Sequence, residues 1–159
     1  IRTAPKDYVQ TLFDKYASHF ENQLVGELNY QPKLLRRIYD ESEEKTRYFH
    51  NVLDLGCGTG LSGTQFADIS GKLVGIDLSE KMIFEAREKG VYSELISGDV
   101  TSKLSEFYSK SRKFDLFICG DVLVYVGDCD ELFAAIRNVA TDDALFEEFF
   151  VILMLHPPP

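Results

Sequence analysis

The sequence contains little cysteine. Its three cysteines are Cys57, Cys119 and Cys129, and no two of them form a Cys-x-x-C pair. An odd number without paired spacing excludes a disulfide framework and is typical of a reduced, cytoplasmic protein. Histidine is equally scarce, and neither His50 nor His156 stands at ligand spacing with the acidic residues. We therefore expect no metal site.

Long hydrophobic runs are also missing. The longest, Phe149 to Leu155, is too short to span a bilayer, and the first ten residues have no apolar signal-peptide core. The sequence therefore predicts no membrane partner. The chain does not begin with methionine. Two explanations are open: residues are missing upstream of Ile1, or the chain is one module of a longer protein.

Positive charge is in deficit. There are 17 lysines and arginines against 26 aspartates and glutamates, which gives a net charge of -9. An acidic surface repels phosphate backbones, so nucleic acid is not the expected partner. A hydrophobic fraction of 45% in 159 residues is sufficient for one core and one domain.

The N-terminal third has a helical pattern. Residues 5–40 carry apolar side chains at helical spacing, interrupted at Gly26 and Pro32, which predicts two or three helices. The charged run at 40–45 is the expected connector. We divide the chain into an N-terminal helical cap, 1–48, and an α/β part, 49–159, within one structural domain.

From residue 52 onward, short apolar runs alternate with helical stretches. This alternation predicts a doubly wound, Rossmann-like and mostly parallel α/β sheet. A fifth strand is expected to open at Ala144. The other predicted strands are 52–55, 72–76, 94–96 and 114–118, and the predicted helices are 61–69, 79–89, 101–110 and 128–140.

A glycine-rich stretch, NVLDLGCGTGLSG, occupies residues 51–63 at the end of the first predicted strand. Its last six residues match the dinucleotide fingerprint G-x-G-x-x-G. From Asp54 to Gly60 the same stretch matches D-x-G-x-G-x-G, the loop of S-adenosylmethionine (SAM) methyltransferases. Glycine lets the backbone approach a ligand closely and turn into the next helix.

Small or acidic residues follow each of the first four predicted strands: the glycine loop, then Asp77, then Asp99-Val100, then Cys119-Gly120-Asp121. Ligands of doubly wound sheets bind at these carboxyl ends. A single aspartate there is more often a turn former or helix N-cap. Four such ends in register favour an adenosine-type cofactor.

Asp54 separates the two cofactor patterns. A carboxylate inside the first strand is costly to bury unless a polar ligand uses it. SAM carries a sulfonium and an ammonium, whereas the pyrophosphate of NAD would be repelled. Short-chain dehydrogenases also need a Tyr-x-x-x-Lys pair, which the sequence lacks. Gly63 is then interpreted as a small residue where a helix packs tightly on the sheet.

Three segments, VLDLGCGTG, GIDLSEKMI and FDLFICGDVLVYVGD, resemble motifs of class I SAM-dependent methyltransferases. The segment FDKYASHFENQLVGELNYQPKLL resembles the N-terminal helices of a bacterial subgroup often joined to tetratricopeptide repeats. It is similar also to ubiquinone/menaquinone and trans-aconitate methyltransferases. The resemblance covers about residues 8–146 and implies the sheet order 3-2-1-4-5-7-6. The resemblance also allows two kinds of protein partner: a tetratricopeptide module, or a second copy of this chain.

The resemblance implies a set of cofactor contacts. The loop residues would hold the methionine and ribose part of SAM, and Asp54 would reach its amino group directly or through water. Asp77 would accept from the ribose hydroxyls. Tyr16 is interpreted either as closing over the methionine tail or as a core aromatic. The other implied contacts are Gly56, Cys57, Gly58 and Gly60 for the loop, Leu78, Met82, Asp99 and Val100 for adenine, and Cys119 and Asp121 for the methyl end.

Catalysis is less well defined than cofactor binding. Candidates for a general base are Asp121, Tyr125 and His19, none of which has a recognisable partner in the sequence. No N-P-P-Y-type motif follows the fourth predicted strand, so we expect methyl transfer to a small molecule, with S-adenosylhomocysteine as product. The alternatives are a nicotinamide-dependent oxidoreductase and a non-catalytic SAM-binding module.

The C-terminal run, EEFFVILMLHP, reads as one long buried strand like the last strand of the family. Only about fifteen residues remain after Ala144, which is too few for a crossover helix and two further strands. The hypothesis is that a segment is missing from the chain between Phe146 and Glu147. The run would then lie antiparallel beside the fifth strand.

Overall fold

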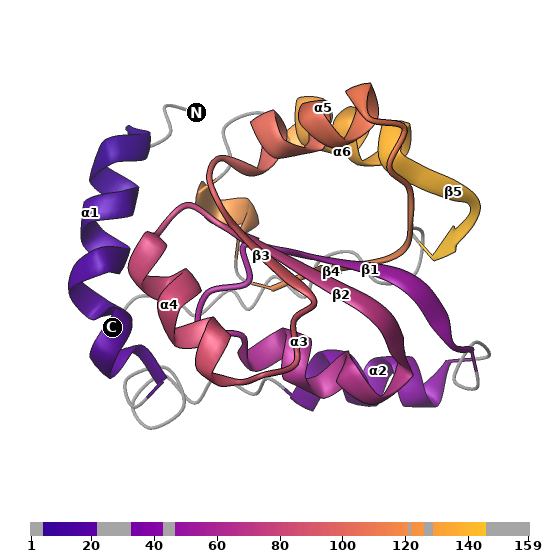
Figure 1. Ribbon diagram of the computed structural model, residues 1–159, viewed down its shortest axis with the longest axis horizontal. Helices are drawn as coiled ribbons and strands as arrows, with labels where there is room; N and C mark the ends of the chain where they lie inside the picture. Colours follow the sequence, from indigo (N-terminus) through magenta and orange to yellow (C-terminus); the bar gives the residue numbers. More distant parts are fainter. Residues whose placement is uncertain (1–4, 22–32, 43–46, 121, 126–128, 146–159) are drawn as a thin grey trace.

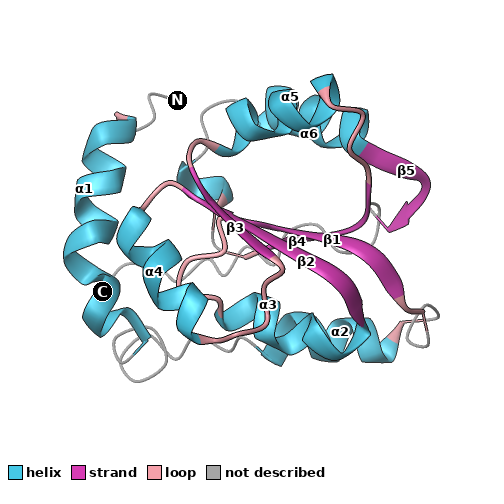
Figure 2. Cartoon of the chain, viewed as in Figure 1, coloured by secondary structure: helices cyan, strands magenta, loops and turns pink. Residues whose placement is uncertain are grey.

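The computed structural model describes residues 5–21, 33–42, 47–120, 122–125 and 129–145. Its sheet has the strand order β3-β2-β1-β4-β5, and all neighbouring strands are parallel (Figures 1 and 2). This confirms the predicted fold class and the first five positions of the expected order. The strands are β1 (Phe49–Leu55), β2 (Ser70–Asp77), β3 (Glu94–Ser97), β4 (Phe114–Cys119) and β5 (Ala140–Leu145).

Helices precede and connect the strands. Among the described residues none is long and apolar enough to cross a bilayer. The α-helices are α1 (Lys6–Tyr16), α2 (Lys33–Glu41), α3 (Leu61–Phe66), α4 (Glu80–Glu88), α5 (Val100–Ser109) and α6 (Cys129–Val139). Short 3-10 turns are η1 (Ala17–His19), η3 (Ala67–Ile69) and η4 (Leu123–Tyr125).

Several expected boundaries were wrong; the first strand, for example, begins at Phe49 and not at residue 52. Asp40 and Glu41, expected in a connector, form the last turn of α2, where Arg36 pairs with Asp40 one turn away at 2.8 Å. The strand β5 begins at Ala140, not Ala144, because Ala140 already pairs with Phe114 of β4. The residues that follow Ala140 in this strand, Thr-Asp-Asp, are polar, so the hydrophobic pattern did not predict its first half. The hypothesis about Phe146 and Glu147 lies outside the described residues.

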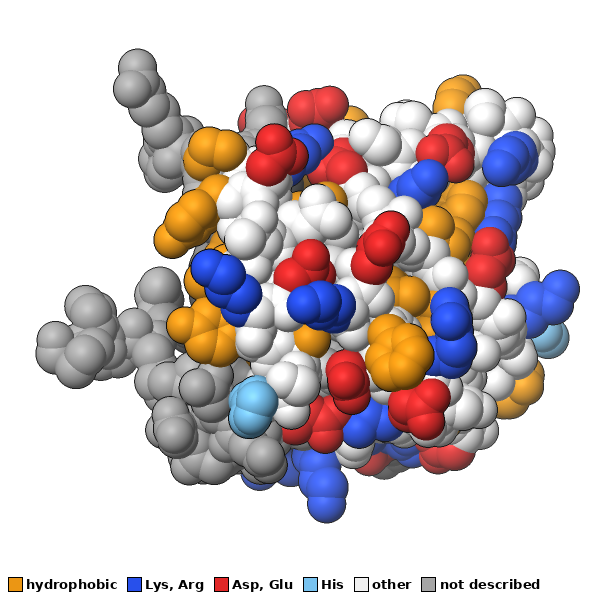
Figure 3. Space-filling view, turned by 60° about the vertical axis from the view of Figure 1, so that its left-hand side comes forward, with side chains coloured by type: hydrophobic (Ala, Val, Ile, Leu, Met, Phe, Trp, Pro, Cys, Tyr) orange, Lys and Arg blue, Asp and Glu red, His pale blue; other side chains and the backbone are white. Residues whose placement is uncertain are grey.

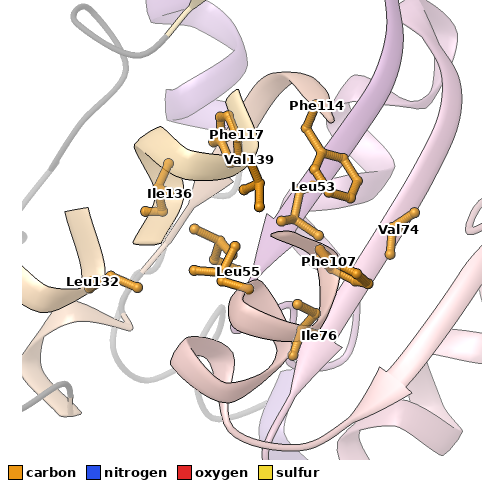
Figure 4. Close-up of a cluster of buried hydrophobic side chains, with 11 residues drawn as sticks. Leu53, Leu55, Val74, Ile76, Phe107, Phe114, Phe117, Leu132, Ile136 and Val139 are labelled. Atoms are coloured by element: carbon orange, nitrogen blue, oxygen red, sulfur yellow. The ribbon is translucent and has the colours of Figure 1, made fainter. Parts of the chain in front are cut away.

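One face of the sheet is covered by α5 and α6. Leucine and phenylalanine side chains from the central strands pack against the apolar stripes of both helices (Figure 4). The alternating positions of β1 and β2 that point to this side are fully buried. The cluster comprises Leu53, Leu55, Val74, Ile76, Leu104, Phe107, Phe114, Phe117, Leu132, Ile136 and Val139.

The opposite face is covered by α2 and α3, with α4 beside them against β2 and β3 (Figure 1). Tyr39 of α2 is fully buried there, and its hydroxyl donates to the carbonyl of Arg47 at 2.8 Å. The helix α2 therefore packs as a layer of the α/β sandwich. Its buried companions are Leu35, Phe49, Val52, Phe66, Leu73, Leu116 and Ile118.

Candidate functional site

The glycine loop after β1 turns sharply into α3. Gly56, Gly58 and Gly60 all have positive φ, at +65°, +52° and +88°, a backbone conformation that other residues rarely adopt. Among the described residues, a Cβ placed on Gly58 would meet a ring atom of Phe20 at 3.7 Å and nothing closer. The loop therefore presents bare backbone at Gly58, the position where the sequence predicts close approach of a ligand.

Asp77 lies at the end of β2 and is joined to this loop. Its carboxylate accepts from the backbone N–H of Gly58 at 2.9 Å and from that of Ser79 at 2.8 Å. Burial raises the pKa of Asp77 in spite of these two donors. Each carboxylate oxygen accepts more than one hydrogen bond, so both retain capacity for ligand hydroxyls.

Asp54 is buried inside β1, with 1% of its surface exposed. One oxygen, Oδ2, accepts from the hydroxyl of Tyr92 at 2.7 Å. The other, Oδ1, is buried without a hydrogen-bond partner among the described residues. Burial raises the pKa of Asp54 to about 7, and the Asp77 charge adds to the rise, against the Tyr92 hydroxyl and the nearby Gly63 N–H. An unpaired buried carboxylate oxygen requires a ligand or a proton.

Tyr92, in the loop between α4 and β3, was missed by sequence reasoning. Its ring lies among three glycines: an added Cβ would come within 2.9 Å of the ring at Gly60, 2.2 Å of the hydroxyl at Gly63, and 2.9 Å of the ring at Gly75. Gly63 is therefore small because it makes room for Tyr92 and the Asp54 carboxylate. This extends the predicted close packing of that helix on the sheet.

Asp99, at the end of β3, acts as the N-cap of α5. Its Oδ1 accepts from the backbone N–H of Ser102 at 3.0 Å, and its carboxylate pairs with Lys6 of α1 at 2.8 Å. Partial burial acts to raise the pKa of Asp99, but Lys6 and Ser102 lower it overall. Val100 is half-buried at the first position of α5. Whether this pair also reads an adenine edge stays a prediction.

The other side chains predicted to contact the cofactor differ in how far they are exposed. Met82 of α4 is buried, whereas Leu78 just before α4 is half-buried and more accessible. Cys57 and Cys119 are buried thiols outside any disulfide. Burial, together with the charges of Asp54 and Asp77, raises the pKa of the Cys57 thiol, so it remains protonated. This supports its interpretation as a pocket wall and not a nucleophile.

The helix α1 lies beside α4, on the side of the molecule where β2 and β3 end (Figure 1). Besides the pair of Lys6 with Asp99, Asp14 accepts from the hydroxyl of Ser79 at 2.5 Å, and Glu21 pairs with Lys89 at 2.6 Å. Ser79 in turn caps α4 by accepting from the backbone N–H of Met82 at 3.2 Å. Hydrogen bonds and ion pairs thus hold residues 5–21 against the residues that follow β2 and β3 and against the end of α4.

Aromatic residues of this segment lie near the glycine loop. The ring of Phe13 contacts those of Phe20 and Tyr125, with centroids 6.0 and 5.1 Å away. Tyr16, at the end of α1, is 42% exposed and so is not a core aromatic. Phe20, which sequence analysis passed over, is the aromatic next to Gly58.

The three candidates for a general base are not brought together as a described group. Tyr125 is 42% exposed, and the exposed His19 has its Nδ1 2.9 Å from the hydroxyl of Ser18. Asp121 lies outside the described residues. In the described part of the chain, no cluster of three or more His, Cys, Asp or Glu side chains could hold a metal ion.

A protein-family model described as a methyltransferase domain matches residues 50–146, which is more than half of the chain. This chain belongs to that methyltransferase family. It is similar to the ubiquinone biosynthesis O-methyltransferase of Glaesserella parasuis, at 24% identity over 70% of this chain and 49% of that protein. It is also similar to the 18S rRNA (guanine-N(7))-methyltransferase of Bos taurus, at 45% identity over 36% of this chain and 20% of that protein.

A solved SAM-dependent methyltransferase from Clostridium acetobutylicum matches with a TM-score of 0.61 and 26% identity over 84% of this chain and 55% of that one. The chain therefore has the class I fold of SAM-dependent methyltransferases. The chain spans less than half the length of both curated relatives.

The described residues fit this cofactor. Two buried polar atoms in the motif, Asp54 Oδ1 and the hydroxyl of Thr59, lack a partner among the described residues, and the loop presents bare backbone at Gly58. Thr59 was another residue that sequence reasoning passed over. Unpaired buried acceptors and donors of this kind are normally satisfied when a polar ligand is bound.

Proposed function

We propose that this chain binds SAM at the loop between β1 and α3 and transfers its methyl group to a small-molecule acceptor. The observation that carries the proposal is the buried Asp54 carboxylate, with one unpaired oxygen, beneath a loop of three positive-φ glycines. A cationic ligand compensates such a carboxylate, whereas a pyrophosphate does not. The proposal therefore favours SAM over a nicotinamide dinucleotide.

Each strand end would hold one part of the ligand. Asp54 takes the ammonium group, the backbone from Gly56 to Gly60 takes the methionine and ribose part, and Asp77 accepts from the ribose hydroxyls. Tyr16 is proposed to close over the methionine tail from α1. Leu78 and Met82 with Asp99 and Val100 are assigned to adenine, and Cys57, Cys119 and Asp121 to the walls.

The adenine assignment has one structural consequence. Lys6 pairs with the Asp99 carboxylate at 2.8 Å, so an adenine amine has to share or displace this contact. Because Lys6 is 67% exposed, the ion pair contributes little stability and yields readily. Residues 5–21 are accordingly the part of the predicted 1–48 cap that we assign to covering the cofactor.

SAM supplies an electrophilic methyl group on its sulfonium. The chain then mainly orients the acceptor, and a base is needed only where the acceptor must lose a proton. Tyr125 is 42% exposed and His19 is also exposed, so we propose alignment as the principal contribution. If a base operates, Asp121, Tyr125 and His19 remain the candidates.

The acceptor proposal rests on charge. The chain carries a net charge of -9, and the face that bears α1 and α4 shows lysines and arginines interspersed with acidic residues (Figure 3). RNA binding needs basic side chains gathered along one surface. The similarity to the rRNA enzyme covers only 36% of the chain. We also propose a cytoplasmic location, in keeping with three cysteines that form no disulfide in the described part of the chain.

The test is calorimetric titration with S-adenosylhomocysteine and with NADH. We expect binding of the first and none of the second; the reverse result would refute the cofactor assignment at this loop. Transfer of labelled methyl groups from SAM is then measured with small carboxylates, phenols and quinol precursors, and with total RNA. Labelled RNA with no labelled small molecule would overturn the acceptor proposal, and binding without any turnover would favour a non-catalytic module.

A further inference from the structure

We infer that Tyr92 is a positioning residue for the amino-acid end of the cofactor: its phenol occupies one oxygen of Asp54 and leaves Oδ1 as the acceptor for the ligand's ammonium group. This inference rests on the proposed SAM site. Tyr92 lies 38 residues beyond Asp54 in the sequence, and its hydroxyl is 2.7 Å from Oδ2.

The ring of Tyr92 packs against the backbone of three glycines. The backbone carries no side chain at Gly60, Gly63 or Gly75, and a Cβ at any of the three would approach the tyrosine within 2.2 to 2.9 Å. Such contacts are closer than real Cβ atoms adopt. Because the ring packs closely against the backbone at these glycines, packing restrains the direction of its hydroxyl and, through the hydrogen bond, the orientation of the Asp54 carboxylate.

A phenol donates one hydrogen, so Tyr92 satisfies only one of the two carboxylate oxygens. Oδ1 stays buried and unpartnered within the described residues. An ammonium group supplies both the missing hydrogen-bond donors and a compensating positive charge. The same orientation would leave an adenosine compound without an amino-acid group unable to satisfy Oδ1.

Besides the backbone N–H of Gly63, the groups that influence Asp54 in the described structure are titratable side chains that are acidic or neutral. They are Asp77 at the end of β2, the Cys57 thiol in the loop, and Tyr92 itself. Burial raises the pKa of Asp54 to about 7, whereas the Tyr92 hydrogen bond lowers it. Burial, with the neighbouring Asp54 charge, also raises the pKa of Tyr92 above its usual range, so Tyr92 remains a neutral donor. Loss of the phenol hydroxyl should therefore leave Asp54 protonated over a wider range of pH.

The test compares two ligands that share the adenosine part. S-adenosylhomocysteine has the amino-acid group, and 5′-methylthioadenosine does not. For Tyr92→Phe we expect the affinity for S-adenosylhomocysteine at pH 7 to fall about tenfold or more, because a larger fraction of Asp54 is then protonated and cannot pair with the ammonium group. The loss should shrink toward pH 8.5 as Asp54 ionises. Affinity for methylthioadenosine should change less than about twofold.

Tyr108→Phe is the matched control, because Tyr108 is 59% exposed and lies on α5. In an Asp54→Asn background, Tyr92→Phe should bring no further loss of S-adenosylhomocysteine affinity. If Tyr92→Phe does not fold, the tyrosines can be replaced with 3-fluorotyrosine, whose phenol is a stronger hydrogen-bond donor. This change should lower the pKa of Asp54, whereas Tyr92→Phe should raise it. The pH at which S-adenosylhomocysteine affinity falls should then move downward.

Several results would overturn the inference. If Tyr92→Phe lowered the affinities for both ligands equally, the contribution of Tyr92 would be merely structural. If both affinities were unchanged, Tyr92 would make no contribution to binding. An unmoved pH profile in the fluorotyrosine protein would count equally against it. If the wild-type protein bound neither ligand, the proposed SAM site itself would be refuted, a failure distinguishable from the others because it does not depend on any variant.

Discussion

Replacing Asp54 by asparagine is expected to stabilise the ligand-free protein above pH 7, although the same change should weaken cofactor binding. Burial raises the pKa of this carboxyl from 3.8 to about 7. The folded protein therefore binds a proton more tightly than the unfolded chain does. The free energy of unfolding should fall as pH rises from about 4 to 7 and stay low above that range.

The size of the effect follows from the same values. A rise in pKa from 3.8 to about 7 corresponds to about 4 kcal/mol of lost stability once Asp54 is fully ionised. The asparagine amide brings its own incompletely paired polar atoms, at a cost of about 1–3 kcal/mol. The variant should therefore gain about 1–3 kcal/mol over the wild type at pH 8, and should have no advantage near pH 4.

Urea denaturation between pH 4 and pH 8.5 measures this difference, provided that the slope of unfolding free energy against urea is the same in both proteins. Other carboxyls titrate in both proteins, so the difference isolates Asp54. Asp142→Asn is the control, because Asp142 is exposed on β5. A difference between Asp54→Asn and wild type that does not vary with pH would refute the reasoning, since Asp54 would then not change its ionisation near neutrality.

Three further substitutions test other contacts of the site. Asp77→Ala should weaken S-adenosylhomocysteine binding by calorimetry more than Asp121→Ala, because it removes the proposed ribose contacts, each worth about 1.5–3 kcal/mol; equal affinities of Asp77→Ala and wild type would contradict the ribose assignment. Gly63→Ala should lower the free energy of unfolding by about 1–3 kcal/mol in spite of better helix propensity, because the new Cβ would lie 2.2 Å from the Tyr92 hydroxyl; an unchanged melting temperature would show that the ring moves freely. Ser79→Ala should cost about 1–2 kcal/mol in a thermal melt through loss of the α4 cap, and a loss below a few tenths would show that the cap is dispensable.

The cofactor loop could be recognised from the sequence because its determinants are local. Three glycines within five residues, directly after an apolar run, indicate a tight turn with positive φ whatever surrounds it. The alternation of apolar runs and helices likewise predicted the parallel sheet, and parallel strands place all their carboxyl ends at one edge. The start of β5 at Ala140 was missed because its first residues are polar.

Partnerships between distant residues were decided only by the tertiary structure. Burial of Asp54 was predicted, but its bond to Tyr92 spans 38 residues, and the link between Asp14 and Ser79 spans 65. No periodicity marks such pairs, because each depends on how a helix or loop packs against a neighbouring strand. An aromatic such as Tyr92 carries the same local signal in a core as in a site. What distinguishes it is the space left by Gly60 and Gly63 at the start of α3 and by Gly75 in β2, which come together only when the helix packs on the sheet.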